Sequence, residues 1–230
     1  AGESEVVRGG ALRWFAPSLS DAVRTLLLSV AIAASTCSTA APLPTPVIHA
    51  DFDDLAKASQ QGGLHIKTQF PTPDTVPGVV GTAWRTDGFS SYAEANLVLE
   101  PPNGLTISFW VALESYPSDL EVPVKDLVPS SFVQQTAGDR GFDLFIDAYG
   151  RWGLKVATSA GTLLAKAEEK FPLGRWVHVI ATIDPASGAI ALLQDEKVVG
   201  IARGEPGMSL RLAQAPLRLA TAATETKLLD

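Results

Sequence analysis

The sequence predicts an all-β protein built as a sandwich of two antiparallel sheets. From residue 47 onward, short runs of apolar and polar residues alternate, which is the periodicity of strands with one buried face. Gly, Pro, Asn and Asp interrupt these runs at the short intervals that tight turns need. No stretch after residue 41 has convincing helical periodicity, although residues 53–60 could form a turn or two. About ten strands at this spacing are typical of a two-sheet sandwich.

Length and charge limit the architecture and the partners. The chain has 230 residues, of which 46% are hydrophobic, enough for one well-buried domain and a short appendage. Its 25 acidic residues outnumber its 18 basic residues and give a net charge of -7. Proteins that bind nucleic acid neutralise phosphates with basic side chains, so we expect no nucleic-acid partner.

The N-terminal part has the pattern of a secretory signal peptide. Residues 24–40 contain one basic residue, then an apolar run, then small residues of the kind that a signal peptidase recognises. The apolar run is too short to cross a bilayer, so we expect no transmembrane span. We therefore predict cleavage after Ala40 and a secreted protein, extracellular or periplasmic. A buried or retained helix is the alternative interpretation of this run.

The predicted signal divides the chain into an N-terminal extension with signal peptide at 1–40, a Pro-rich linker at 41–46 and a domain at 47–230. Cys37, the only cysteine, lies inside the signal, so the domain can form no disulfide. Acylation of Cys37 would instead make the protein a lipoprotein. We favour this less, because Ser35 and Thr36 stand where a small Gly or Ala usually precedes an acylated cysteine.

The individual strands follow from the alternation, taken in chain order. Short candidates at 47–53 and 91–99 precede the strongest signal, residues 105–114. There, Leu105 and the alternate residues after it point to one face, while Trp110 lies on the more polar opposite face.

Residues 141–147 and 152–158 form a predicted hairpin around a turn at 148–150. Its apolar face is shared by Phe142, Leu144, Ile146, Trp152, Leu154 and Val156. Its opposite, more polar face carries Asp143, Phe145, Asp147 and Lys155.

Residues 175–184 and 189–194 form a second predicted hairpin, joined by Asp184-Pro-Ala-Ser-Gly188. Pro fixes φ and Gly accepts a positive φ, so this connection favours a tight reversal. Both faces are almost entirely apolar, which predicts that the pair is covered on both sides in the middle of a sheet. The remaining short strands are expected at 128–134, 162–168, 197–202 and 216–220.

Several phrases in this order resemble a known superfamily. They are Leu105-Thr-Ile-Ser-Phe-Trp-Val, Arg175-Trp-Val-His-Val, Gly188, Leu192 and Asp195-Glu-Lys-Val198. Together they are similar to the laminin-G-like, concanavalin A-like jelly-roll domains, over residues 47–222. The resemblance implies a jelly-roll sandwich. Glu196 stands where the family turn usually has Gly, so we expect a different turn geometry there. The family's usual last strand has no counterpart near Asp230, so we expect the domain to be truncated at that strand.

A finer similarity concerns residues 110–117, 141–150 and 166–173. These phrases look like the laminin-G-like module that precedes the catalytic propeller in some secreted bacterial enzymes of glycoside hydrolase family 32, which act on fructans and sucrose. The resemblance implies an accessory module of a larger glycoside hydrolase, with an adjacent catalytic domain or a carbohydrate as partner. The alternative is an adhesion or protein-interaction domain of a cell-surface protein, without a sugar ligand.

Catalysis by this chain alone is not expected. Retaining hydrolysis needs two carboxyl groups about 5 Å apart, and neither the N-D-P-N, R-D-P and E-C motifs of family 32 nor the E-x-D-x-x-E of jelly-roll glucanases occurs. Asp143 and Asp147 share one strand face, but a solvated strand edge accounts for them. His178 and Asp184 lack a serine in a G-x-S-x-G turn, so we interpret His178 as structural.

Carbohydrate binding needs exposed aromatic faces with hydrogen-bonding side chains beside them. Trp110 lies on the polar face of its strand, and the polar face of the first hairpin carries an aromatic ring among charged groups. The candidate carbohydrate-binding residues are therefore Trp110, Asp143, Phe145, Asp147 and Lys155. The alternative is that the second sheet or a neighbouring domain covers these aromatic residues.

Calcium is the one metal that the sequence favours, and no other cofactor is expected. Asp51, Asp53 and Asp54 cluster, and carboxylate oxygens are the ligands that Ca²⁺ prefers. An acidic entry to the first strand is the alternative interpretation. His49 and His65 have no zinc-ligand spacing.

Overall fold

The computed structural model describes residues 46, 48–53, 64–67, 74–86, 91–97, 99, 104–119 and 129–222. All of them belong to one compact unit, Pro46–Asp230. The predicted signal peptide and Asp54 lie outside the described residues. Within the part of the chain that is described, no helix is long and apolar enough to cross a membrane.

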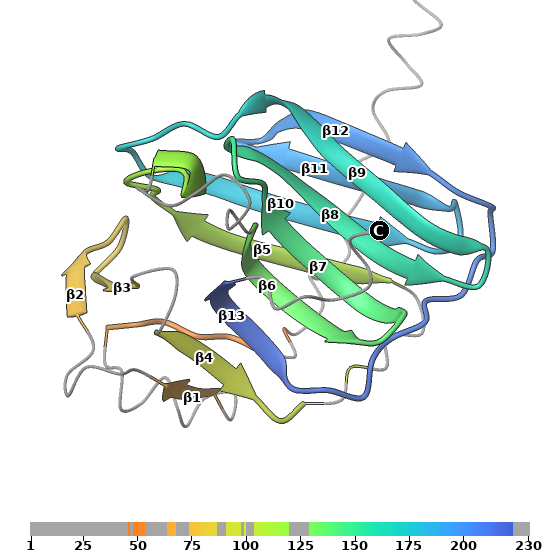
Figure 1. The fold of residues 1–230 in the computed structure, drawn as a ribbon, viewed down its shortest axis with the longest axis horizontal. Coiled ribbons are helices and arrows are strands. Elements are labelled where there is room, and N and C mark those ends of the chain that lie inside the picture. Colours follow the sequence, from red (N-terminus) through yellow and green to blue (C-terminus); the bar gives the residue numbers. More distant parts are fainter. Residues whose placement is uncertain are drawn as a thin grey trace, which may run out of the picture. The chain divides into compact units, whose positions relative to one another are not determined.

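The described fold is all-β, as predicted, apart from one 3-10 turn, η1 (Pro117–Asp119) (Figure 1). Its strands are β1 (Leu64–Lys67), β2 (Asp74–Pro77), β3 (Thr82–Arg85), β4 (Tyr92–Ala95), β5 (Leu105–Val111), β6 (Ser130–Ala137), β7 (Arg140–Ile146), β8 (Arg151–Thr158), β9 (Gly161–Lys170), β10 (Val177–Asp184), β11 (Ala189–Gln194), β12 (Lys197–Arg203) and β13 (Leu217–Ala222). Residues 48–53, predicted as part of a strand, do not form one, and β1, β2 and β3 were not predicted.

Two sheets form the sandwich (Figure 1). The larger sheet has the order β1-β4-β13-β6-β7-β8-β9, and the smaller sheet has the order β12-β11-β10-β5. All strand pairs are antiparallel. A separate pair is formed by β2 and β3. The last described strand, β13, lies between β4 and β6, so early and late parts of the chain share the larger sheet.

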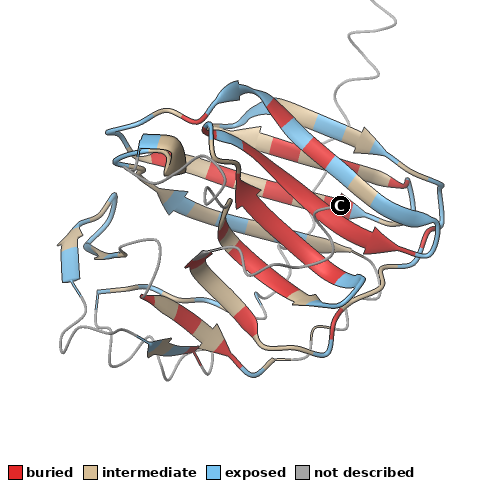
Figure 2. Cartoon of the chain, viewed as in Figure 1, coloured by how far each residue is buried: buried red, intermediate tan, exposed pale blue. Residues whose placement is uncertain are grey.

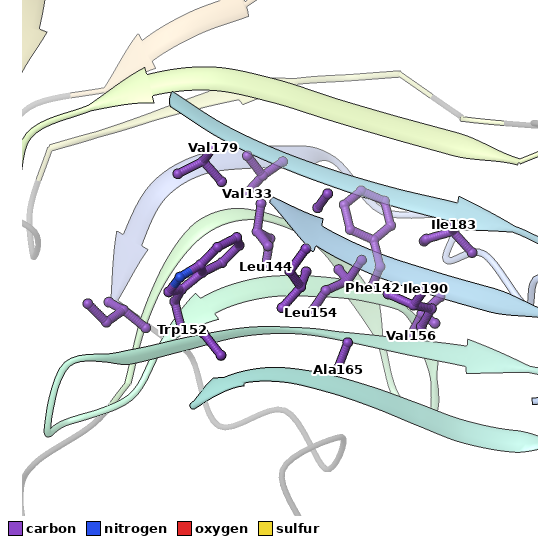
Figure 3. Close-up of a cluster of buried hydrophobic side chains, with 14 of the residues drawn as sticks. Val133, Phe142, Leu144, Trp152, Leu154, Val156, Ala165, Val179, Ile183 and Ile190 are labelled. Atoms are coloured by element: carbon purple, nitrogen blue, oxygen red, sulfur yellow. The ribbon is translucent and has the colours of Figure 1, made fainter. Parts of the chain in front are cut away.

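The core fills the space between the two sheets (Figure 3). The predicted hairpin is confirmed as β7 and β8, whose register pairs Leu144 with Leu154. Their inward side chains meet those of β10 and β11, and the largest fully buried ones include Trp152, Phe142, Phe171, Leu144, Leu154, Ile190 and Leu192. Burying one such side chain contributes roughly 1.5–3 kcal/mol, so this layer dominates the stability of the sandwich.

A β-bulge in β6 decides which of its residues face outward. The register with β7 shifts between Ser131 and Val133, and Phe132 and Val133 both pack on the core. The extra residue turns Ser131 and Gln134 to the outer face of the larger sheet, because a bulge lets two adjacent residues share one side of the strand.

The strands that are covered on both sides are β7 and β8, not the predicted β10 and β11. Nearly every residue of β7 and β8 is buried (Figure 2). On β10, Val177, Val179 and the next alternate residues are buried, but His178 and Ile180 on the outer face are only half-buried. The prediction failed because an apolar outer face does not by itself show that another layer lies over it. β10 does lie in the middle of its sheet, between β5 and β11.

The turn between β11 and β12 corrects a second expectation. Asp195 and Glu196 have φ values of 48° and 66°, so both are in the left-handed region, as in the type I′ turns of two-residue hairpins. Glu196 therefore adopts the conformation that Gly would take, rather than a different turn. For a residue with a side chain this costs about 1–2 kcal/mol.

Candidate functional site

Trp110 lies on the outer face of the smaller sheet, on the strand at its edge. Its neighbours Phe109 and Val111 pack on the core, so alternation turns the indole outward, as the sequence predicts. The residue is 49% exposed. In the described part of the chain, no strand pairs with β5 on the side away from β10. An aromatic ring half open to solvent at a sheet edge is a surface on which a ligand can stack.

His178 of β10 stacks against Trp110. The register places the two residues opposite each other, and their rings lie 4.8 Å apart with 16° between the planes. The Ser108 hydroxyl oxygen is 2.9 Å from His178 Nε2, a hydrogen-bond distance. The stack holds the indole on one side and leaves a hydroxyl and an imidazole next to it. We call Ser108, Trp110 and His178 the Trp110 face.

The backbone of His178 is fixed by the turn after β11. Asp195 Oδ1 accepts a hydrogen bond from the His178 N–H at 2.9 Å, and Asp195 Oδ2 accepts one from Arg175 at 2.8 Å. The pKa of Asp195 lies below its ordinary value, because the His178 N–H favours the charged form more than partial burial opposes it, and Arg175 adds to the effect. Sequence reasoning interpreted His178 as structural and did not place it beside Trp110, since alternation gives the face of a residue but not its register with a neighbouring strand.

Apolar side chains also lie on this outer face. Val198 and Ile201 on the edge strand β12 are 57% and 56% exposed. Between them and β5, the side chains of Ile180 and Leu193 are half-buried. This apolar strip is continuous with the Trp110 face through the register of β10 with its two neighbours.

The predicted site residues do not form one surface. Asp143, Phe145 and Lys155 lie on β7 and β8 of the larger sheet, whereas Trp110 belongs to the smaller sheet. Both sets point away from the core between the sheets, so they lie on opposite sides of the sandwich. The expectation that the hairpin residues are exposed is also wrong, because the three are only 1%, 6% and 9% exposed. Their role in binding stays a prediction.

Asp147, the fourth hairpin residue, holds its own turn together. It pairs with Lys166 at 2.6 Å, and it accepts backbone hydrogen bonds from Tyr149 at 3.0 Å and Arg151 at 2.9 Å. Burial acts to raise its pKa, but Lys166 and the backbone N–H groups outweigh burial, so the pKa is lowered. These contacts explain the position of Asp147 without a ligand.

Asp143 is a carboxylate that lies buried within the larger sheet. It is buried and lies directly between Gln134 of β6 and Lys155 of β8. Neither carboxylate oxygen has a hydrogen-bond partner of ordinary geometry among the described residues. Burial raises the pKa of Asp143 to about 6, against the opposing influence of Ser131 and Lys155.

The predicted calcium residues have different surroundings. Asp51 is exposed. Asp53 accepts hydrogen bonds from the Thr82 N–H at 2.6 Å and the Thr82 hydroxyl at 3.2 Å. Among the residues that the structure describes, no three His, Cys, Asp or Glu side chains lie together as a metal site would require. Asp54 lies outside this set, so calcium binding stays a prediction.

The fold and sequence have relatives among known proteins. Residues 86–228 match the family model of the Concanavalin A-like lectin/glucanases superfamily. No curated protein matches the chain in sequence.

Three solved structures are similar at a low level. Domain 4 of AbnA, an extracellular arabinanase of glycoside hydrolase family 43 from Geobacillus stearothermophilus in complex with arabinotriose, is 16% identical over 71% of this chain and 75% of that one, with a TM-score of 0.45. Domains LG4-5 of the mouse laminin α1 chain are 14% identical over 54% and 31%, with a TM-score of 0.41. The carbohydrate-binding module CBM66 from Bacillus subtilis is 9% identical over 70% and 89%, with a TM-score of 0.36. Similarity at this level does not identify a ligand for this chain.

Proposed function

The chain belongs to the concanavalin A-like lectin/glucanases superfamily, and we propose that it is a non-catalytic accessory module that binds carbohydrate at the Trp110 face. The observation that carries the proposal is the half-exposed indole of Trp110, held on one side by His178 at the edge of a sheet. Sugar rings present C–H groups that stack on such a ring. Ser108 and His178 supply hydrogen-bonding groups next to it, and a few convergent polar groups around an apolar surface are the usual composition of a ligand site.

The larger context is part of the same proposal. Three phrases of the sequence resemble the module that precedes the catalytic domain of family 32 glycoside hydrolases, so the proposed polysaccharides are fructans, with sucrose as the small substrate. The proposed protein is secreted through the signal at residues 24–40. Its catalytic residues lie in an adjacent domain, since the motifs that family 32 catalysis needs do not occur in these 230 residues.

Isothermal titration of the purified chain tests the proposal directly. The titrants are inulin, levan and unrelated glycans, each with calcium and with a chelator. We expect saturable binding to one fructan, lost at least tenfold in Trp110→Ala. Tyr149→Ala is the matched control, because Tyr149 is an aromatic residue with 58% exposure in the turn between β7 and β8, which belong to the larger sheet and not to the sheet that carries the Trp110 face. Equal loss in both variants, or no binding by a folded chain, contradicts the proposal. An affinity that falls on chelation supports calcium at the aspartate cluster.

One observation favours the second candidate, an interaction domain that binds protein. The exposed Val198 and Ile201 make the outer face of the smaller sheet more apolar than a sugar site requires, and such patches are typical of protein contacts. If the folded chain binds no glycan, and the sequence that follows it encodes repeated sandwich domains rather than the N-D-P-N and R-D-P motifs, the second candidate holds and the first fails.

A further inference from the structure

Two hydroxyl residues precede Trp110 on the same face of β5. The residues between them, Ile107 and Phe109, pack on the core, so alternation turns Thr106 and Ser108 outward together with Trp110. Both hydroxyl residues are exposed. Four residues of a strand span about 13 Å. Thr106 and Trp110 therefore mark the two ends of an exposed row of about that length on the outer face of the smaller sheet.

The neighbouring strand β10 adds a hydroxyl at the far end of this row. The register places Thr182 opposite Thr106, just as it places His178 opposite Trp110. Thr182 is half-buried, and its hydroxyl donates a long hydrogen bond, 3.5 Å, to the Ala191 carbonyl oxygen. A hydroxyl oxygen also accepts hydrogen bonds, and this contact leaves that capacity unused. Two hydroxyl groups on adjacent strands, about 4.8 Å apart, thus lie at the end of the row away from the indole.

The face along β5 and β10 carries no Asp, Glu, Lys or Arg side chain between these two ends. Its outward residues are Thr106, Ser108, Trp110, His178, Ile180 and Thr182. The charged residues just beyond the ends have partners of their own: Asp184 accepts a hydrogen bond from the Ala186 N–H at 3.0 Å, and Asp195 pairs with Arg175 at 2.8 Å. The net charge of -7 also repels a polyanion at long range. These charges favour a neutral ligand.

A sugar chain that stacks on Trp110 has two paths over this face. One path follows β5 to Thr106. The other crosses the strands over Ile180, Leu193 and Val198, which the registers place in one row. On the second path, the sugar hydroxyls would face apolar side chains and would lose hydrogen bonds to water without replacement, which is costly. The path along β5 offers hydroxyl partners and is therefore favoured.

We propose that the Trp110 face extends along β5 to Thr106 and Thr182, so that the site takes a neutral oligosaccharide of at least three linked units. The inference rests on the proposed function, because it specifies the length and charge of the glycan at the same face. One unit stacks on the indole, and a unit about 13 Å away exchanges hydrogen bonds with the two threonine hydroxyls. That span exceeds the length of a disaccharide, so a disaccharide on the indole reaches Ser108 but not the threonines.

Isothermal titration of the full chain with oligosaccharides of graded length tests the extent of the site. The probes are size-fractionated oligosaccharides of inulin and of levan, with two to five units. We expect affinity to rise about tenfold above that of the disaccharide and then to level off, because two further hydrogen bonds of ordinary strength have about that effect. Oligogalacturonides of the same lengths, with a carboxylate on each unit, should not bind.

A double variant, Thr106→Val with Thr182→Val, removes both hydroxyls and keeps β-branched side chains, which suit a strand. We expect it to lose the gain in affinity with length and to bind the disaccharide as the parent does. Thr106→Val alone, at an exposed position, should lose part of the gain. Thr162→Val is the matched control, because Thr162 is an exposed threonine on β9 of the larger sheet, and it should leave every affinity unchanged. Urea unfolding checks that each variant is folded.

The outcomes separate this inference from the proposed function. Equal affinity for two and five units, or a gain with length that survives in the double variant, overturns the extended site but leaves binding at Trp110 intact. Binding of inulin or levan without binding of any of their oligosaccharides overturns it as well, and binding of the oligogalacturonides overturns the assignment to a neutral ligand. If the folded chain binds neither the polysaccharides nor their oligosaccharides, the proposed function itself fails. Trp110→Ala should abolish binding at every length.

Discussion

Asp195 and His178 are joined by two backbone-directed hydrogen bonds. The Asp195 side chain accepts from the His178 N–H at 2.9 Å, and the Asp195 N–H donates to the His178 carbonyl oxygen at 2.9 Å. The turn between β11 and β12 is thereby tied to β10 at the residue that stacks on Trp110. The position of the imidazole depends on a carboxylate that does not touch the proposed ligand.

Replacement of this carboxylate should affect stability and binding together. In Asp195→Ala the His178 N–H and Arg175 both lose their acceptor, so we expect the free energy of unfolding to fall by about 1–3 kcal/mol. Glycan affinity at the Trp110 face should fall severalfold. Asp195→Asn keeps an acceptor for the N–H and should cost less than half as much. Urea unfolding and titration of the three proteins check this, and an unchanged affinity in Asp195→Ala would show that His178 needs no support from the turn.

Glu196→Gly should stabilise the chain. The backbone at Glu196 has a φ of 66°, and Gly adopts this region without the penalty of about 1–2 kcal/mol that a side chain imposes. Because Gly also gains entropy in the unfolded state, we expect a net gain of about 1 kcal/mol. Lys197→Gly is the control, since Lys197 begins β12 and Gly in a strand is destabilising. A melting temperature of Glu196→Gly below that of the parent would contradict the inference that the backbone of Glu196 is strained.

Stability should fall between acid and neutral pH because of Asp143. Its pKa is about 6 in the folded state against an ordinary 3.8, so the folded state binds the proton more tightly than the unfolded state. The corresponding stabilisation is fully present below pH 3.8 and is lost as the pH rises through about 6. A shift of about two units corresponds to about 3 kcal/mol. The groups nearest the carboxylate on its own and neighbouring strands are Ser131, Gln134 and Lys155.

Asp143→Asn should remove this fall, so the variant gains stability over the parent between pH 5 and 8. Urea unfolding at several pH values measures the difference. Asp139→Asn is the control, because Asp139 is exposed and paired with Arg211, and its pKa is lowered. Its contribution is lost only as the pH falls below 3.8, so this variant should not alter the slope above pH 5. A parallel pH profile for Asp143→Asn and the parent would rule out the raised pKa.

Gly153→Ala should be strongly destabilising. The added Cβ would meet the Ala165 carbonyl oxygen at 2.7 Å, and backbone atoms of a paired strand move little. We expect a loss of about 1–3 kcal/mol from overpacking. At Gly138 nothing lies within 4 Å, but φ is +58°, so Gly138→Ala carries only the left-handed penalty. Thermal unfolding of both variants checks that Gly153→Ala loses more stability than Gly138→Ala. An equal or smaller loss in Gly153→Ala would contradict the close approach of Gly153 to the Ala165 carbonyl oxygen.

Alternation in the sequence was sufficient to place Trp110 outward and Leu144 and Leu154 inward, because side-chain direction in a strand depends only on local spacing. It could not place Asp143, since the same alternation marks a residue as outward whether or not that face is covered. The pairing of Trp110 with His178 was also beyond it, because register depends on strands that are far apart in the sequence.

The bulge in β6 and the short strands β2 and β3 could not be predicted from the local sequence pattern either. Phe132 is an extra residue that changes the phase of β6, and nothing in the apolar pattern distinguishes it from Val133. The pair β2 and β3 has four residues in each strand and includes Pro77, a residue that argues against a strand unless it lies at an end or edge. Such short strands form because each pairs with the other across the turn that joins them, which the residues of either strand alone do not predict.

The position of β5 at the rim of its sheet bears on the kind of chain that could be recognised there. A blind pocket admits only the terminus of a polymer, because the walls stop the next unit. Among the described residues no strand lies beyond β5 to act as such a wall, so a long polysaccharide bound at Trp110 would cross the indole and continue in both directions. Attachment at internal units would let the module settle anywhere along a fibre and would leave the free termini to a neighbouring catalytic domain.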